Sequence, residues 1–246
     1  MILKTVGLIL RAIKFRESDL ILTVLSRDYG KIALIAKGAR RPESKFGAAL
    51  DLLTLSELVF YEGENLKLLK EASILNDFRD LKREYERLET ALHAASLLNH
   101  LIEDEHPDRA VFDLCEDFLS HLGHLKKLRL GELAFKLKLL RAAGLAPRLN
   151  RCARRGHRLT SELWFSTQHG GLVCAECHQA GDARIEPGTA QSLKMLLGTR
   201  WERLDRLALY DDKLEIAHRL VDEFIGYHLR DVRRSLTCSR SSPQRE

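Results

Sequence analysis

Cysteine is scarce in this chain, with five in 246 residues. Domains that rely on a disulfide scaffold are much richer in cysteine, so the composition excludes such a scaffold and predicts a reducing, intracellular compartment. Three of the five gather at Cys152, Cys174 and Cys177. Cys115 falls in the apolar stripe of a predicted helix, where we expect a core position. Cys238 lies in a polar tail, and no role is predicted for it.

Long apolar runs are also missing. No uninterrupted apolar stretch approaches about 18 residues, the length that a membrane-spanning helix needs. The first residues include Lys4 and show no signal-peptide cleavage pattern. We therefore expect no membrane segment and a cytoplasmic protein. Apolar residues make up 45% of the chain, which is enough to fill the cores of two domains.

Familiar catalytic motifs are absent as well. The sequence has no Gly-x4-Gly-Lys-Ser/Thr phosphate loop, no Gly-x-Ser-x-Gly elbow and no His-Glu-x-x-His helix. Acidic residues cluster at 103–105, but no second acidic cluster accompanies them. A nuclease built from scattered carboxylates is therefore a weaker alternative, and we predict a binding protein rather than an enzyme.

Charge is strongly segregated along the chain. Residues 4–45 hold ten Lys and Arg against four Asp and Glu, whereas residues 80–125 hold four against eleven. Residues 126–158 hold eleven against one. Such blocks usually mark faces that meet a charged partner. We interpret the acidic block as solvated helix faces, and the last basic block as a surface for a polyanion.

Residues 1–78 show the pattern of short strands. Apolar and β-branched stretches at 3–15, 19–26, 31–36, 50–61 and 66–75 are separated by turn signals such as Asp28-Tyr29-Gly30. Five short strands without a long helix predict a small closed barrel of the OB type. A five-stranded SH3-like barrel is the competing interpretation.

From residue 80 the apolar period changes to that of helices. The spacing predicts helices over 80–102, from a cap at Asp108 to Leu122, over 128–143, from Pro187 to 197, and over 213–229. The fold class is therefore α+β: an OB domain (1–78), then a helical domain (79–236) with a knuckle insert at about 148–182. A polar, disordered tail is predicted for 237–246.

The segment 36–47 is predicted to be a basic loop between the third and fourth strands. Loops of OB barrels flank a nucleic-acid groove, and cations there contact phosphates without reading bases. We assign DNA phosphates to Lys37, Arg40, Arg41 and Lys45, with a hydrogen bond from Ser44. Tyr29 or Phe46 could stack on an unpaired base, although Phe46 fits better as a residue of the barrel core.

The second basic surface combines the helix over 128–143 with the knuckle. Arginine donates bidentate hydrogen bonds to phosphate, and this segment is rich in arginine. We expect about a third of its cations to pair with the acidic helices instead. The cations assigned to DNA are Arg129, Lys136, Arg141, Arg151, Arg154 and Arg155.

The knuckle has the spacing of a zinc ribbon with one ligand replaced. Cys174 and Cys177 form a Cys-x-x-Cys turn after Gly170-Gly171, but Arg155 stands where a second Cys-x-x-Cys would complete the set with Cys152. His157 is the best substitute ligand; His178 and His169 are weaker ones. Structural zinc is one interpretation, and a metal-free knuckle with buried cysteines is the other. Catalytic zinc is disfavoured.

Several segments resemble the RecO family of bacterial DNA repair proteins. They are 7–11, 17–22, 30–41 and 44–46 in the barrel, then 135–147, Phe165-Ser, Gly170-Gly171 and the Cys-x-x-Cys. The resemblance is colinear over nearly all of residues 1–235, and the Ala-Lys-Gly loop and the segment from Leu-x-Pro to the cysteines are most specific. Many members carry a four-cysteine zinc site, which maps onto Cys152, Cys174 and Cys177, with Arg155 departing from the pattern.

The resemblance implies a non-catalytic recombination mediator that acts on damaged DNA. Such a protein binds single- and double-stranded DNA, anneals complementary strands and helps load recombinase on strands coated by SSB. The implied partners are RecR and the C-terminal tail of SSB, and the implied location is the nucleoid. An RNA-binding or ribosome-associated OB module is the alternative.

Overall fold

The computed structural model describes residues 1–63, 66–209 and 211–239, with side chains described as far as residue 229. The chain forms two compact units, residues 1–128 and 129–246. Among the described residues, none of the helices has both the length and the apolar character needed to cross a membrane.

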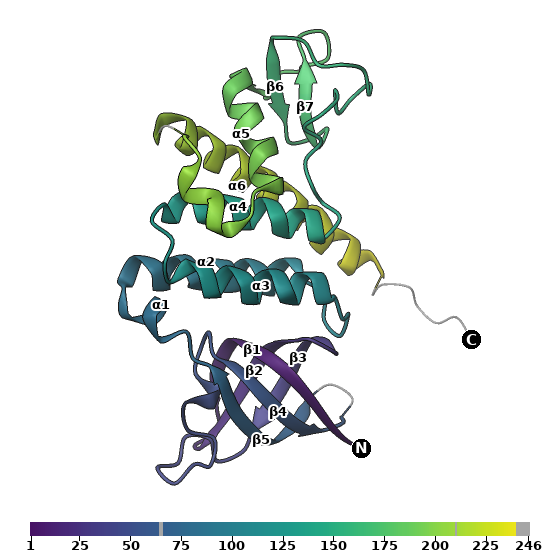
Figure 1. Cartoon of the computed structure of the whole chain (residues 1–246). Coiled ribbons are helices and arrows are strands. Elements are labelled where there is room, and N and C mark those ends of the chain that lie inside the picture. Colours follow the sequence, from purple (N-terminus) through teal and green to yellow (C-terminus); the bar gives the residue numbers. More distant parts are fainter. Residues whose placement is uncertain (64–65, 210, 240–246) are drawn as a thin grey trace, which may run out of the picture. The chain divides into compact units, whose positions relative to one another are not determined.

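The first unit contains a closed five-stranded barrel (Figure 1). Its strands are β1 (Ile2–Phe15), β2 (Asp19–Ser26), β3 (Gly30–Ala36), β4 (Leu55–Tyr61) and β5 (Lys67–Asn76). Their order around the barrel is β1-β2-β3-β5-β4, with β3 and β5 parallel and the other pairs antiparallel. The predicted OB-type barrel is confirmed. Side chains at alternate positions, such as Leu22, Val24 and Phe60, fill its core.

One predicted strand is too long. The prediction of 50–61 covers β4, but η1 (Gly47–Leu50), a single 3₁₀ turn, and a loop precede it. Leu50 and Leu53 are buried all the same, because the loop folds back on β1 through hydrogen bonds from Leu53 N to Ile9 O and from Ile9 N to Thr54 O. Leu53 has a positive φ of 57°, which breaks the strand.

Three helices complete the first unit: α1 (Arg79–Arg83), α2 (Tyr85–Leu101) and α3 (Arg109–Leu122). The single helix predicted over 80–102 is thus two, separated at Glu84, whose backbone is extended. The predicted cap of α3 is confirmed, because the Asp108 carboxylate accepts hydrogen bonds from the amides of Ala110 and Val111.

Cations of the barrel hold these helices. Lys31 Nζ donates to the carbonyl of Asn99 near the end of α2, at 2.7 Å, and pairs with Asp104. Lys67 pairs with Glu105, and Arg27 with Glu116. Part of the acidic block therefore binds the barrel, which explains why α1–α3, placed by the sequence in the helical domain, share a compact unit with the strands.

The second unit consists of helices and the knuckle. The helices are α4 (Leu128–Ala142), α5 (Pro187–Gly198) and α6 (Asp211–Ser239), with η2 (Trp201–Arg206), a 3₁₀ segment. Strands β6 (Leu163–Ser166), β7 (Gly171–Cys174) and β8 (Ala183–Ile185) form an antiparallel sheet in the order β7-β6-β8. Phe165 of β6 meets Phe224 of α6 edge to face. The tail predicted from residue 237 falls partly in α6, and residues 240–246 lie outside the described residues.

Candidate nucleic-acid interface and metal centre

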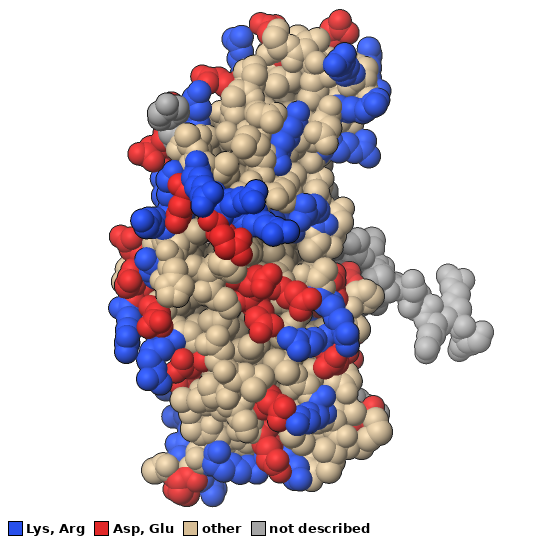
Figure 2. All heavy atoms as spheres, in the orientation of Figure 1, with Lys and Arg blue, Asp and Glu red and all other residues tan. Residues whose placement is uncertain are grey.

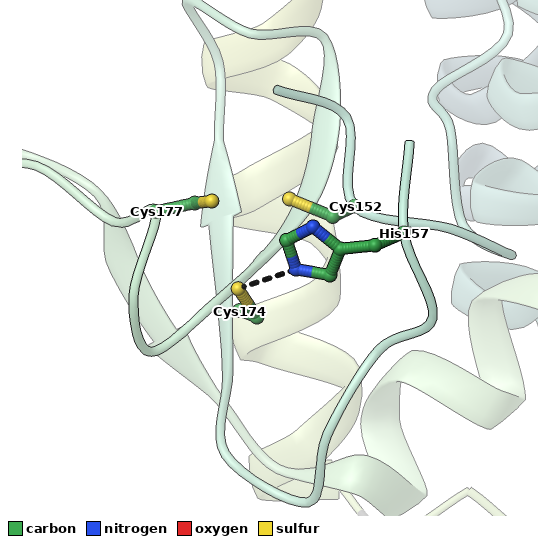
Figure 3. Close-up of side chains that lie close together, drawn as sticks. All are labelled: Cys152, His157, Cys174 and Cys177. Atoms are coloured by element: carbon green, nitrogen blue, oxygen red, sulfur yellow. Dashed lines mark hydrogen bonds between the residues drawn. The ribbon is translucent and has the colours of Figure 1, made fainter. Parts of the chain in front are cut away.

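The three knuckle cysteines and His157 form one cluster. The ligand atoms of Cys152, His157, Cys174 and Cys177 all lie within 4.8 Å of one another. Figure 3 shows the three sulfurs and the imidazole grouped around a common point, and the imidazole Nε2 lies 3.0 Å from Cys174 Sγ. The cysteines are buried, and His157 is half-buried. Of the histidines that the sequence offers, His157 is the one that joins the cluster.

Two tight turns bring these ligands together. The amide of Cys152 donates to the carbonyl of His157, and the amide of Gly156 donates back to the carbonyl of Cys152. Gly156 has a φ of 75°, which turns the chain so that residue 157, and not residue 155, points inward. The amides of Cys177 and His178 both donate to the carbonyl of Cys174. Arg155 is left exposed on the outside of the first turn.

The cluster could hold a metal ion. Cys₃His is one of the regular ligand sets of structural zinc, with Zn–S near 2.3 Å and Zn–N near 2.0–2.1 Å. A tetrahedron with these bonds separates its ligand atoms by about 3.5–3.8 Å, so small shifts would close this cluster on an ion. Four protein ligands leave no open position for a substrate, so the geometry suits a structural site rather than a catalytic one.

Two thiols of the cluster, those of Cys152 and Cys177, differ in pKa. Burial alone would raise the pKa of Cys152, but hydrogen bonds from the backbone amides of Cys174, Arg155 and Arg154 lower it to about 7. Burial, followed by the neighbouring thiols of Cys174 and Cys152, raises the pKa of Cys177 to about 11. One sulfur is thus readily available as the thiolate that a metal requires.

Outside the cluster, Cys115 is buried in α3, as expected.

The basic loop keeps most of its charge exposed. Lys37 and Arg41 are exposed and make no ion pair or side-chain hydrogen bond within the described parts of the chain. Arg40 differs, because its guanidinium donates to the carbonyl of Glu17. Lys45 lies over the ring of Phe46, and the Ser44 hydroxyl accepts from the amide of Phe46. Phe46 itself is buried in the barrel core, the better of its two predicted roles.

The cations of α4 are largely engaged inside the second unit. Lys136 is only 13% exposed and pairs with Glu132 and Asp222. Arg129 pairs with Glu215. Lys138 and Arg141 donate to the carbonyls of Thr199 and Leu197, at and just before the end of α5. These side chains are placed to stabilise helices, and phosphate contacts would compete with their present partners.

Unpaired arginines concentrate elsewhere in the second unit. Arg151, Arg155 and Arg158 of the knuckle are exposed and, among the described side chains, have no ion-pair or hydrogen-bond partner; the guanidinium of Arg154 reaches the carbonyl of Cys177. Figure 2 shows a further gathering of Lys and Arg over α4 and η2, while Asp and Glu gather over α2 and α3. The η2 region adds cations that the sequence analysis missed, namely Arg200, Arg203 and Arg206, which are spaced every three residues.

Comparisons with known proteins identify the family. The model described as Recombination protein O N terminal matches residues 1–78, and the model described as Recombination protein O C terminal matches residues 82–237. The chain belongs to the RecO family. RecO proteins are recombination mediators without enzymatic activity, so the predictions of a DNA repair family and of a non-enzyme are confirmed.

Curated RecO relatives cover nearly the whole chain. The DNA repair protein RecO of Halalkalibacterium halodurans is 30% identical, over 94% of this chain and 92% of the relative. That of a Nocardioides species is 31% identical, over 93% and 95%. That of Anaeromyxobacter dehalogenans is 34% identical, over 80% and 75%. RecO membership favours the DNA repair interpretation over the RNA-binding module.

Proposed function

We propose that this chain is a DNA-binding recombination mediator. It binds single- and double-stranded DNA, anneals complementary strands and helps load recombinase on strands coated by SSB. The observation that carries the proposal is a closed OB-type barrel, with a loop of exposed cations, in a chain of the RecO family. The protein acts in the cytoplasm at the nucleoid, where DNA and reduced thiols occur together.

Two surfaces supply the phosphate contacts. In the loop, Lys37, Arg41 and Lys45 bind phosphates. Arg40 stabilises the loop through its hydrogen bond to the Glu17 carbonyl and adds positive charge. Ser44 donates a hydrogen bond to a phosphate. In the second unit, the knuckle arginines carry the larger part, because α4 uses Arg129, Lys136 and Arg141 in internal contacts. The second surface therefore centres on Arg151, Arg154 and Arg155.

A structural zinc ion holds the knuckle in shape. Cys152, His157, Cys174 and Cys177 are the ligands, and their donor set matches the Cys₃His class. Zinc when bound would neutralise the thiolates and fix both turns. The arginines between Cys152 and His157 would thereby be held in one arrangement on the surface.

The protein partners are RecR and the C-terminal tail of SSB. A pocket of about 310 Å³ in the second unit suits the tail, because its wall is apolar and Arg206 lies on it. Leu130, Met195 and Leu196 would receive an apolar side chain, and Arg206 the terminal carboxylate. Weaker binding of a labelled tail peptide by Met195→Asp and by Arg206→Glu would support this site; unchanged affinity for both variants would exclude it.

Salt titration of DNA binding tests the loop. Each phosphate contact contributes about 0.7 to the slope of log K against log salt for single strands. Lys37→Ala/Arg41→Ala should therefore lower the slope by up to about 1.4 and weaken binding. The matched control is Lys4→Ala/Lys70→Ala, which also removes two barrel cations, both of them paired with glutamates. Equal slopes for the wild type and the loop variant would refute the loop assignment.

A further inference from the structure

The knuckle sheet has an aromatic stack on the face opposite to the one that packs on α6. In β6, Leu163 and Phe165 are buried, and Phe165 packs on α6, so Trp164 lies on the opposite face. Its indole is stacked on the imidazole of His178, with 4.2 Å between ring centroids and 10° between planes. Arg184, its neighbour in β8, holds its guanidinium 5.9 Å from the indole centroid.

His178 is fixed in position yet open to solvent. Its Nδ1 lies 2.7 Å from the carbonyl of Ala175, and its amide donates to the carbonyl of Cys174, so the imidazole is held by the Cys-x-x-Cys turn. Trp164 beneath it is half-buried against the cysteine cluster. The side chain of His178 is exposed, and one of its ring faces is covered by Trp164. The other face is therefore available to a planar ligand.

Three arginines belong to the segment that packs beside this stack. Arg154 donates to the carbonyl of Cys177, the residue next to His178. Arg158 precedes Leu159, which packs with Trp164 against the cysteine cluster. Arg155 and Arg158 have exposed guanidinium groups without a partner among the described residues. An open aromatic face flanked by cations matches the chemistry of single-stranded nucleic acid, whose bases offer π-faces and whose backbone offers phosphates.

We propose that the Trp164–His178 stack is a platform for an unpaired base of single-stranded DNA, with Arg154, Arg155 and Arg158 on the neighbouring phosphates. The inference rests on the proposed DNA-binding function and goes further, because it names the strand form and the residues that distinguish it. Bases in a duplex are already stacked on one another, so the platform favours single strands, whereas the cations serve both forms.

Two measurements on the full chain test the platform. The chain has two tryptophans, and Trp201 is buried, so Trp201→Phe leaves Trp164 as the fluorescent reporter. We expect an oligothymidine to quench Trp164 and a duplex of equal length to quench it much less. His178→Ala should weaken oligothymidine binding by about five- to a hundredfold and leave duplex binding within about twofold, whereas His178→Tyr should retain single-strand affinity.

The matched control is His169→Ala, which changes another knuckle histidine; His169 contacts Gln179 and, among the described residues, no aromatic ring. It should leave single-strand affinity unchanged. Zinc content measured on each variant separates loss of the platform from unfolding of the knuckle. If His178→Ala loses zinc, the platform is tested instead by the single-strand affinity of His178→Tyr and by the quenching of Trp164. Unquenched Trp164 at saturating oligothymidine, or equal losses for single strand and duplex, would overturn the platform. Absence of binding to either DNA by the wild type would instead overturn the proposed function.

Discussion

His157 is the residue on which the proposed metal site depends. Its imidazole lies among three sulfurs, and the turn that delivers it is closed by hydrogen bonds between Cys152 and residues 156 and 157. Changes beyond the direct ligands already cost about 10–100-fold in metal affinity, so His157→Ala should weaken zinc binding by at least about 100-fold. Competition with a chromogenic chelator measures this loss.

Two further variants make that prediction specific. His157→Cys supplies another zinc ligand and should keep one equivalent of zinc. Arg155→Ala removes an exposed side chain from the same turn and should also keep it. Full zinc content in purified His157→Ala would show that the imidazole is not a ligand.

His218 predicts a dependence of stability on pH. Burial lowers its pKa, and the positive charges of Lys136 and Arg129 act in the same direction, while its hydrogen bond to the Arg129 carbonyl and Glu132 oppose them. The folded state thus binds a proton at His218 less readily than the unfolded state, whose pKa is near 6.5. The stability that neutral His218 contributes is complete above that pH and is lost as the pH falls through the lowered folded value.

Urea denaturation at about pH 7.5 and pH 5.5 measures this loss. The loss of unfolding free energy on acidification should be larger in the wild type than in His218→Gln, which retains an N–H donor without titrating. Both proteins share the Arg129 contact, which is the largest cause that lowers the pKa of Glu215; the charge of His218 has a smaller effect on that carboxylate and is absent from His218→Gln. Identical losses for the two proteins would contradict the prediction.

At the scale of elements, two adjacent glycines show how the knuckle is assembled. Gly171 opens β7 with its Cα so close to residue 148 that an added Cβ would lie 2.3 Å from the Arg148 carbonyl oxygen. Gly170 has a φ of +77° but nothing within 4 Å of such a Cβ. Gly170→Ala should therefore cost only the backbone penalty, about 1–2 kcal/mol. Gly171→Ala should add an overpacking cost of about 1–3 kcal/mol. Thermal unfolding of both variants measures the difference, and equal destabilisation would refute the close approach.

The sequence could predict elements wherever one local rule decides them. Alternation marked the barrel strands, the Asp108 cap marked α3, and the Cys-x-x-Cys turn marked Cys174 and Cys177. The sequence did not predict the structure where a contact with a residue far away in the chain decides it. Leu50 and Leu53 are apolar because they fold back on β1, and not because they form a strand. Lys136 points inward to pair with Asp222, and Lys138 points inward to the Thr199 carbonyl at the end of α5. The sequence around these two lysines does not indicate that they are engaged inside the unit.

At the scale of the whole molecule, the cations fall into two groups: some make contacts inside the protein, and others are exposed and free to contact DNA. Lys31, Lys67 and Lys138 are buried, and each of them meets a carboxylate or a helix-terminal carbonyl. Lys37 and Arg41 of the loop, like Arg151, Arg155 and Arg158 of the knuckle, have no such partner among the described side chains. Net charge therefore overstates the surface open to DNA, and the pairing of each cation is the better guide.

Removal of the proposed zinc ion should act on one unit and spare the other. The four ligands belong to residues 129–246, and the barrel core is built entirely from residues 1–128. Because a structural zinc ion contributes its binding energy to folding, chelation should release the knuckle from its folded form. Hydrogen exchange should show lost protection in β6, β7 and the segment 148–182, with retained protection in β1–β5. The His157→Ala variant should show the same pattern without chelator. Loss of protection in the barrel strands, or unchanged protection in the knuckle after zinc is shown to have left, would contradict a structural role for the metal.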